Sequence, residues 1–219
     1  KVDSLPDQVS LADLSVVADA VTTPLEAIAR AELGPQDIAV FVGVGGVGGF
    51  GVQIAAAVGA QVIAIDTDAS RLELAAEHGA ALTLPAGDAR QLKKAVRAFQ
   101  KESSHRGIGL KVFETSGTPA GQQTAYALLD PGAHLSVVGY SPHKAEFRLS
   151  NLMALDATAQ GNWGCDPARY PEALQLVIDG KVKLQPYIEH YPLKEAPEVL
   201  QAVAAHSLKK RPVLVPMEK

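Results

Sequence analysis

Strand-like and helix-like patterns alternate along the chain from about Asp37 onward. Runs of β-branched and other apolar residues predict strands at 38–42, 61–65, 111–114 and 134–138, with a shorter one at 81–84. Apolar positions at helical spacing predict helices at 47–58, 70–78, 89–102 and 120–129. Alternation without tight hairpin signals is typical of parallel strands joined by helical crossovers. We therefore predict an α/β fold, a doubly wound parallel six-stranded sheet in the order 3-2-1-4-5-6.

The two ends of the chain do not fit inside that sheet. Thr23 followed by Pro24 predicts a helix with a threonine N-cap and a proline in its first turn. Near the other end, a helix over 193–205 precedes residues 211–215, which read as a lone strand with no evident partner. We expect three parts: an interdomain segment and helix (1–34), the sheet domain (35–185), and a C-terminal segment (186–219).

Composition narrows the class of protein. The 219 residues are 47% hydrophobic and 20% charged, enough for a sizeable core in one domain or one and a half. A formal charge of −4 argues against a nucleic-acid partner, and no apolar run approaches the length of a membrane span. The single cysteine, Cys165, excludes an intrachain disulfide and a cysteine-only metal site. The first residues hold neither an initiator Met nor a signal-peptide segment, so we expect a cytoplasmic piece of a longer protein.

Glycines directly follow the first predicted strand. Gly43, Gly45 and Gly48 match the G-x-G-x-x-G pattern, in which the first allows a tight turn, the second lets a pyrophosphate approach, and the third lets helix and strand pack closely. The helix that follows presents unpaired N–H groups to a phosphate. A second register beginning at Gly46 does not start where the strand ends, so we reject it. The alternative is a close-packed turn without a ligand.

An acid at the end of the second strand favours the ligand. Asp66 follows Gly48 by 18 residues, where a carboxylate can accept hydrogen bonds from both ribose hydroxyls of an adenosine. Asp68 adds negative charge, so a 2′-phosphate would be repelled and would find only Arg71 as a partner. The sequence therefore predicts a Rossmann domain that binds NAD rather than NADP. The alternative for Asp66 is a solvated cap of the next helix.

These features resemble the cofactor-binding part of the medium-chain zinc-type alcohol dehydrogenases over nearly the whole chain. The further motifs that carry the resemblance are Leu5-Pro6-Asp7, Gly34-Pro35-Gln36-Asp37, Gly79-Ala80, Glu114–Gly117, Pro131-Gly132, Val138-Gly139 and Gly180-Lys181-Val182. The family places its catalytic domain before residue 1. The resemblance thus implies an NAD-dependent dehydrogenase when full length, whereas this chain alone is expected to bind NAD and to catalyse nothing.

The resemblance also assigns cofactor contacts. Thr23 and Val47 are expected beside the nicotinamide, and Arg71 near the adenosine. The remaining expected contacts are with the glycine loop, the adenosine side of the cleft and the carboxamide: Gly43, Gly45, Gly46, Gly48, Asp66, Thr115, Ser116, Val138, Asn162 and Trp163.

Asp19 resembles the position of the family's third zinc ligand, four residues before Thr23. A catalytic zinc needs three protein ligands, and one carboxylate holds the ion too weakly. Zinc is therefore expected in the full-length enzyme and not in this chain. The alternative is that Asp19 is an ordinary exposed acid. The histidines show no helical pairing and are expected in loops or on the surface: His78, His105, His134, His143, His190 and His206.

Two runs, 113–122 and 149–165, resemble most the 6-hydroxycyclohex-1-ene-1-carbonyl-CoA dehydrogenases of anaerobic benzoyl-CoA degradation. That resemblance implies oxidation of a cyclic secondary alcohol by NAD⁺, with zinc as a Lewis acid. Lys144, Arg148 and Lys181 are candidate contacts for CoA phosphates. The alternatives are an alcohol or polyol dehydrogenase of the same family, a stand-alone NAD-binding redox sensor, and an S-adenosylmethionine methyltransferase, which has no need of Gly48.

Two further expectations concern a rival motif and assembly. Tyr140 and Lys144 match the Tyr-x-x-x-Lys of short-chain dehydrogenases, but Pro142 between them indicates a loop rather than a helical turn. The family commonly dimerises through edge strands beyond 134–138, so we expect a homo-oligomer.

Overall fold

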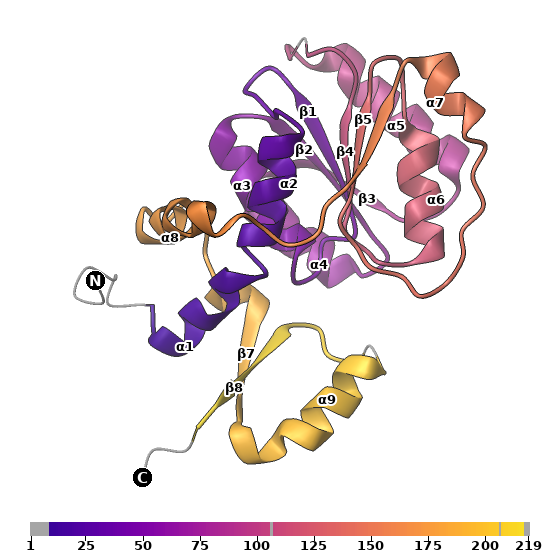
Figure 1. The fold of residues 1–219 in the computed structure, drawn as a ribbon. Helices are drawn as coiled ribbons and strands as arrows, with labels where there is room; N and C mark the ends of the chain where they lie inside the picture. Colours follow the sequence, from indigo (N-terminus) through magenta and orange to yellow (C-terminus); the bar gives the residue numbers. More distant parts are fainter. Residues whose placement is uncertain (1–8, 106, 206, 217–219) are drawn as a thin grey trace.

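A computed structural model describes residues 9–105, 107–205 and 207–216 (Figure 1). The motif Leu5-Pro6-Asp7 and His206 lie outside the described residues. The main sheet has six parallel strands in the order β3-β2-β1-β4-β5-β6, which confirms the predicted topology. In chain order the strands are β1 (Ile38–Val42), β2 (Gln61–Asp66), β3 (Ala80–Pro85), β4 (Lys111–Glu114), β5 (His134–Val137) and β6 (Thr158–Gly161).

Helices cover both faces of this sheet, and each face has its own apolar core. One core joins the sheet to α2 (Thr22–Arg30), α3 (Gly48–Val58), α4 (Ala69–Glu77) and α8 (Tyr170–Ile178). The other joins it to α5 (Ala89–Glu102), α6 (Pro119–Leu128) and α7 (Ser150–Leu155). Phe41 of β1 and Phe113 of β4 lie side by side in the first core, where their rings stack with centroids 4.7 Å apart. Burial on both faces explains why β1 reads as an unbroken apolar run.

Capping residues fix where the helices on these faces begin. Asp88 accepts hydrogen bonds from two backbone N–H groups at the start of α5, and Asp68 accepts one from Ser70 at the start of α4. Thr118 caps α6, with Pro119 at the first helical position. The predicted helices are confirmed to within two residues at either end, except those at the two ends of the chain.

The predicted threonine N-cap of the first long helix is wrong. α2 begins at Thr22, its N-cap is Val21, and no side chain caps it. Thr23 is already helical, and its hydroxyl donates to Oδ1 of Asp19 at 3.2 Å. That bond uses the group that would otherwise have capped the backbone. Ahead of α2 the chain forms α1 (Leu11–Leu14) and the 3-10 turn η2 (Ser15–Ala18).

The expectation of an unpartnered strand at 211–215 is also wrong. β8 (Arg211–Val215) pairs in parallel with β7 (Ile188–Pro192), and the two form a separate two-stranded sheet. The connection between them holds the 3-10 turn η5 (Leu193–Glu195) and α9 (Ala196–Ala204), which replace the single predicted helix over 193–205. We call residues 188–215 the C-terminal module; it lies apart from the main sheet (Figure 1).

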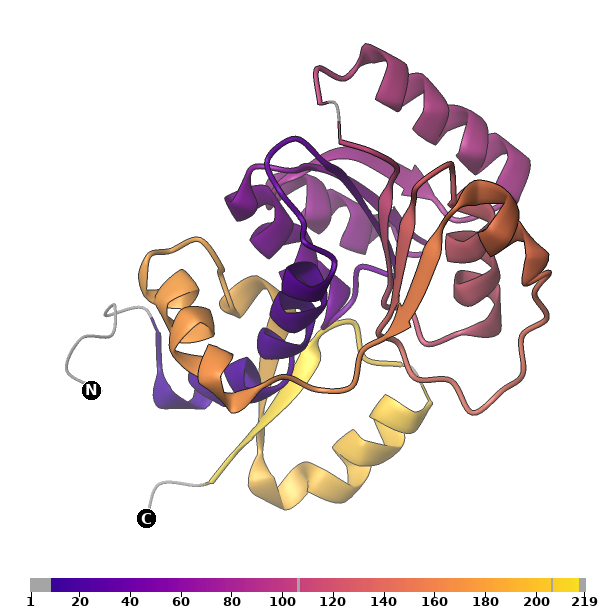
Figure 2. The same cartoon turned by 45° about the horizontal axis from the view of Figure 1, so that its top comes forward.

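The turn directly before the C-terminal module packs against the start of α3. Tyr187, which ends the 3-10 turn η4 (Gln185–Tyr187), lies against Gly49, where a Cβ would come within 2.1 Å of its ring. The ring also packs on Phe50 at a centroid distance of 5.2 Å. Another connection, from β6 through η3 (Pro167–Arg169) to α8, passes beside α2 (Figure 2). At the start of α8, Tyr170 donates to the carbonyl of Ala18 in η2.

Candidate cofactor-binding site

The loop between β1 and α3 has one packed side and one open side. Gly43 adopts φ +90°, and a Cβ there would come within 2.6 Å of the Ser116 backbone. A Cβ at Gly48 would lie 1.9 Å from the Gly43 carbonyl oxygen. Gly45 and Gly46, in contrast, meet only side-chain atoms at 3.5 Å or more. The first and third glycines of the motif are therefore required for packing, and the open side is left for a ligand.

Asp66 lies beside that loop at the end of β2. Its Oδ2 accepts a hydrogen bond from the Val44 N–H at 2.7 Å, and its Oδ1 accepts one from the Asp68 N–H at 2.9 Å. The carboxylate is 6% exposed. The helix cap is Asp68, whose hydrogen bonds with Ser70 lower its carboxyl pKa. The alternative of Asp66 as a solvated cap is therefore wrong, and Asp66 joins the glycine loop to the end of β2.

Two arginines flank the open side of the loop. Nη1 of Arg71 is 3.5 Å from the Cβ position of Gly45 and 3.9 Å from Oδ1 of Asp66. Nε of Arg71 is buried and has no hydrogen-bond partner among the described residues. On the other side, Cβ of Arg211 is 3.5 Å from the Cβ position of Gly46. The Arg71 guanidinium beside the N-terminus of α3 makes this side of the loop suited to a phosphate, whereas the Arg211 guanidinium is paired with Asp19.

The β4–α6 turn forms the wall behind the glycine loop. The Thr115 hydroxyl donates to the Gly43 carbonyl at 2.5 Å, and Ser116 is the residue that a side chain at Gly43 would strike. Both predicted residues thus contact the loop itself. Val138 follows β5 immediately, and its N–H donates to the Glu114 carbonyl at 2.9 Å. The carboxyl ends of β1, β4 and β5 are held together here, at the switch point of the strand order.

Residues predicted near the nicotinamide meet at the start of α2. The Asn162 side chain donates to the Thr23 carbonyl at 3.4 Å and accepts a hydrogen bond from Arg30 at 3.2 Å. Val47 is half-buried at the N-cap of α3. Trp163 is 90% exposed. The structure thus joins Thr23 to Asn162, whereas Trp163 points into solvent.

The sequence did not single out two residues that the structure places at the site, Arg211 and Glu114. Arg211 reaches the loop from β8, more than 160 residues along the chain, and only the unforeseen β7–β8 pairing brings it there. Glu114 appeared only as part of a motif. It is 1% exposed at the end of β4, and the signal available in the sequence was an acid that ends an apolar strand.

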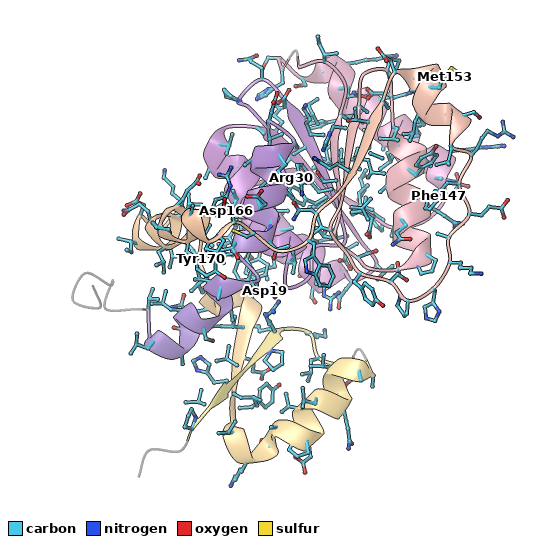
Figure 3. The ribbon with its side chains drawn as sticks, viewed as in Figure 1. Asp19, Arg30, Phe147, Met153, Asp166 and Tyr170 are labelled. Atoms are coloured by element: carbon cyan, nitrogen blue, oxygen red, sulfur yellow. The ribbon has the colours of Figure 1, made fainter. Side chains whose placement is uncertain are left out.

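Asp19 lies between the sheet domain and the C-terminal module (Figure 3). Its side chain is 63% exposed, and its Oδ2 forms an ion pair with Nη2 of Arg211 at 2.5 Å. Its Oδ1 accepts the hydrogen bond from Thr23. In the part of the chain that the structure describes, no three His, Cys, Asp or Glu side chains lie close enough to hold a metal ion. The described residues alone therefore do not fit a catalytic zinc, and we derive no step through it.

The rival short-chain motif has no structural basis. Tyr140 and Lys144 lie in an irregular segment between β5 and α7, so they do not share a helical turn. Lys144 and Arg148 are exposed on that segment, and Lys181 is exposed after α8. None of the described helices has the length and apolar character needed to cross a bilayer.

The fold and the loop define a dinucleotide-binding domain of the Rossmann type. A family model described as "Zinc-binding dehydrogenase" matches residues 46–179, which is more than half of the chain. The chain therefore belongs to the zinc-binding dehydrogenase family.

Individual relatives agree with this assignment. D-xylulose reductase of Saccharomyces cerevisiae is 26% identical over 93% of this chain and 57% of its own length. Acetophenone reductase of Geotrichum candidum, solved in complex with NAD, superposes with a TM-score of 0.79 and 26% identity over 96% of this chain and 57% of that one. Galactitol-1-phosphate dehydrogenase of Escherichia coli, at 23% identity and a TM-score of 0.83 over 97% of this chain and 62% of that one, shares the fold. The chain thus spans about three fifths of the length of these relatives.

Proposed function

We propose that the whole protein is an NAD-dependent alcohol dehydrogenase and that this chain is its cofactor-binding part. The observation that carries the proposal is the glycine loop with Asp66 bonded to its backbone and an open side flanked by Arg71 and Arg211. A ligand with a pyrophosphate and a free ribose diol matches that arrangement. The two engaged oxygens of Asp66 retain lone pairs for ribose hydroxyls.

Each part of the site has a separate task in this proposal. The loop N–H groups bind the pyrophosphate, Arg71 lies near the adenosine, and Asp66 selects a ribose without a 2′-phosphate. Thr23, Val47, Val138 and Asn162, with Trp163 from the surface, would orient the nicotinamide. The bound nicotinamide supplies the hydride acceptor at C4, and the protein supplies position and electrostatics. A stand-alone redox sensor would use the same residues for binding but has no need of a carboxylate at Asp19.

We also propose Asp19 as one zinc ligand of the full-length enzyme, with the other ligands outside this chain. Carboxylate oxygen is a legitimate zinc donor, and the 63% exposure of Asp19 leaves it accessible at the junction. In the chain as described, Arg211 neutralises that carboxylate. The three-part division at 1–34, 35–185 and 186–219 belongs to the same proposal, as does a cytoplasmic location.

For the substrate we propose a cyclic secondary alcohol, with a CoA thioester as the finer assignment. The support for the thioester is that residues 113–122 and 149–165 resemble the 6-hydroxycyclohex-1-ene-1-carbonyl-CoA dehydrogenases. The exposed side chains of Lys144, Arg148 and Lys181 are the candidate phosphate contacts. Relatives that are a D-xylulose reductase, a galactitol 1-phosphate 5-dehydrogenase and an alcohol dehydrogenase favour a second candidate, a simple alcohol or polyol. The ratio of kcat/KM for a cyclic hydroxyacyl-CoA to that for xylitol, measured on the full-length enzyme, decides between them.

We propose further that the protein is a homo-oligomer, joined along β6. This strand ends the sheet, and in the described part of the chain its outer edge pairs with no strand. Leu149 and Met153 are more than 70% exposed on and beside the adjacent α7, and Phe147 is exposed on the same side (Figure 3). Exposed strand edges and apolar patches both favour association. Sedimentation at micromolar concentration should give the mass of a dimer, and a monomer would contradict this part.

The cofactor assignment is tested on the chain itself. NADH should bind at least tenfold more tightly than NADPH in a fluorescence titration, a difference of about 1.4 kcal/mol or more. Asp66→Ala should weaken NADH binding and narrow that ratio, because it removes both the ribose acceptor and the repulsion of a 2′-phosphate. Equal affinities for the two nucleotides in the unmodified chain would overturn the preference for NAD.

A further inference from the structure

Glu114 is a buried acid to which the proposed function gives no task. It ends β4 and is 1% exposed. Burial raises the pKa of its carboxyl group, against the opposing effect of hydrogen bonds from Ser116 and Gly117. Oε2 is buried and has no hydrogen-bond partner among the described residues. A buried acid is costly to keep, so its contacts indicate what it does.

The other oxygen of Glu114 holds the turn that follows β4. Oε1 accepts hydrogen bonds from the Ser116 N–H at 2.9 Å, the Ser116 hydroxyl at 2.5 Å and the Gly117 N–H at 3.2 Å. These are all short-range bonds, made within three residues of Glu114. They fix the conformation of the 115–117 turn, in which Gly117 adopts φ +65°.

That turn is closely packed against the glycine loop. Ser116 occupies the space that a side chain at Gly43 would need, at 2.6–2.7 Å. The Thr115 hydroxyl, bonded to the Gly43 carbonyl, is 2.6 Å from the Cβ position of Gly48. A shift of the turn by a few tenths of an ångström would therefore move Gly43 and Gly48, which are the two ends of the glycine loop.

The same acid also joins the turn to the end of β5. The Glu114 carbonyl accepts hydrogen bonds from the N–H groups of Val138 and Gly139, and Oε2 is 2.8 Å from the Cβ position of Gly139. That Cβ position is also 2.2 Å from the Gly117 nitrogen. Glu114 thus contacts both the 115–117 turn, which packs against the glycine loop, and the segment that follows β5.

We propose that Glu114 is a positioning residue for the dinucleotide: its side chain sets the 115–117 turn, and the turn holds the glycine loop in the shape that receives the pyrophosphate. The inference rests on the proposed function, because it assumes a dinucleotide on that loop. Glu114 itself does not touch the ligand. Its removal should therefore change affinity for the cofactor through the loop, beyond any effect on folding.

The test compares NADH dissociation constants, measured by fluorescence well below the unfolding temperature of each variant. Glu114→Ala should weaken NADH binding about tenfold or more. Glu114→Gln keeps an acceptor oxygen for the turn and should stay within about threefold of the unmodified chain. Ser116→Ala removes one donor from a half-buried position and should give an intermediate loss, which keeps the test available if Glu114→Ala fails to fold.

Asp13→Ala is the matched control, since Asp13 is also a buried acid but belongs to the capping box of α1. It should lower the unfolding temperature and leave the NADH dissociation constant unchanged. A purely structural role for Glu114 would give the same result for Glu114→Ala as for Asp13→Ala, and that outcome would overturn the inference. An unmodified chain that binds no NADH would instead contradict the proposed function.

Discussion

The glycine loop and the junction at Asp19 are two candidate sites that share Arg211 but differ in how complete they are. The loop is enclosed by contacts within the chain: Asp66 bonds its backbone, and the Thr115–Ser116 turn lies directly behind it. Asp19 is a single exposed carboxylate that forms an ion pair with Arg211. Among the described residues, it does not belong to a group of three side chains that could hold a metal ion. One site is built from this chain, whereas the other needs groups that the described residues do not supply.

The difference follows from how many parts of a protein each kind of site needs. A dinucleotide is bound largely by backbone N–H groups and a few side chains at the carboxyl edge of one sheet, so one domain suffices. A catalytic metal needs three ligands in fixed geometry, and these can come from segments far apart in the chain.

The largest effect is expected for Gly48→Ala. The new methyl group would lie 1.9 Å from the Gly43 carbonyl oxygen, so the backbone of the loop must move. We expect NADH binding to weaken by at least about 100-fold, or about 2.7 kcal/mol. Gly87→Ala is the matched control, because apart from its two chain neighbours no described residue lies within 4 Å of that Cβ position. An NADH titration that gives the same affinity for both variants would show that the loop does not bind the cofactor.

A smaller effect is expected for Arg211→Ala. Loss of the side chain whose aliphatic stem lies against Gly46 should weaken NADH binding by up to about tenfold, or about 1.4 kcal/mol. Asp19→Ala should leave NADH binding within about threefold, because Asp19 contacts Arg211 and the Thr23 hydroxyl but not the glycine loop. Its effect on stability should be below about 1 kcal/mol, since the pair is partly exposed. Isothermal titration of both variants checks the contrast, which would fail if Asp19→Ala were the more damaging change.

The smallest effect is on the pH dependence of stability. Burial raises the pKa of Glu114 above its value in the unfolded chain, so the folded state holds a proton that the unfolded state releases as pH rises. The contribution of Glu114 to stability is therefore complete below the unfolded pKa of about 4.5 and decreases as pH rises through the folded pKa. Glu114→Gln removes this slope. Urea unfolding from pH 4 to 8 should show the unmodified chain losing stability relative to the variant; a constant difference would contradict the prediction.

Most of the sheet was predictable from the sequence, because its strands are buried on both faces and its helices carry clear periodicity. The glycine loop and Asp66 were predictable for a related reason: they follow strand ends at a spacing that the fold fixes. The β7–β8 pair was not, since a two-stranded sheet leaves little apolar signal and its paired residues are 23 positions apart, as Ile188 and Arg211 are. Arg211 was missed with it. Thr23 was misassigned as a cap because the sequence does not show that Asp19 takes its hydroxyl.

Equilibrium dialysis is the direct test of whether this chain holds a complete cofactor site and an incomplete metal site. The chain is dialysed against NADH and zinc together, and both are then measured per mole of protein, with Asp19→Ala alongside. We predict close to one NADH per chain in both samples and zinc well below one per chain in both. One zinc per unmodified chain that is lost in Asp19→Ala, or no bound NADH, would contradict the account.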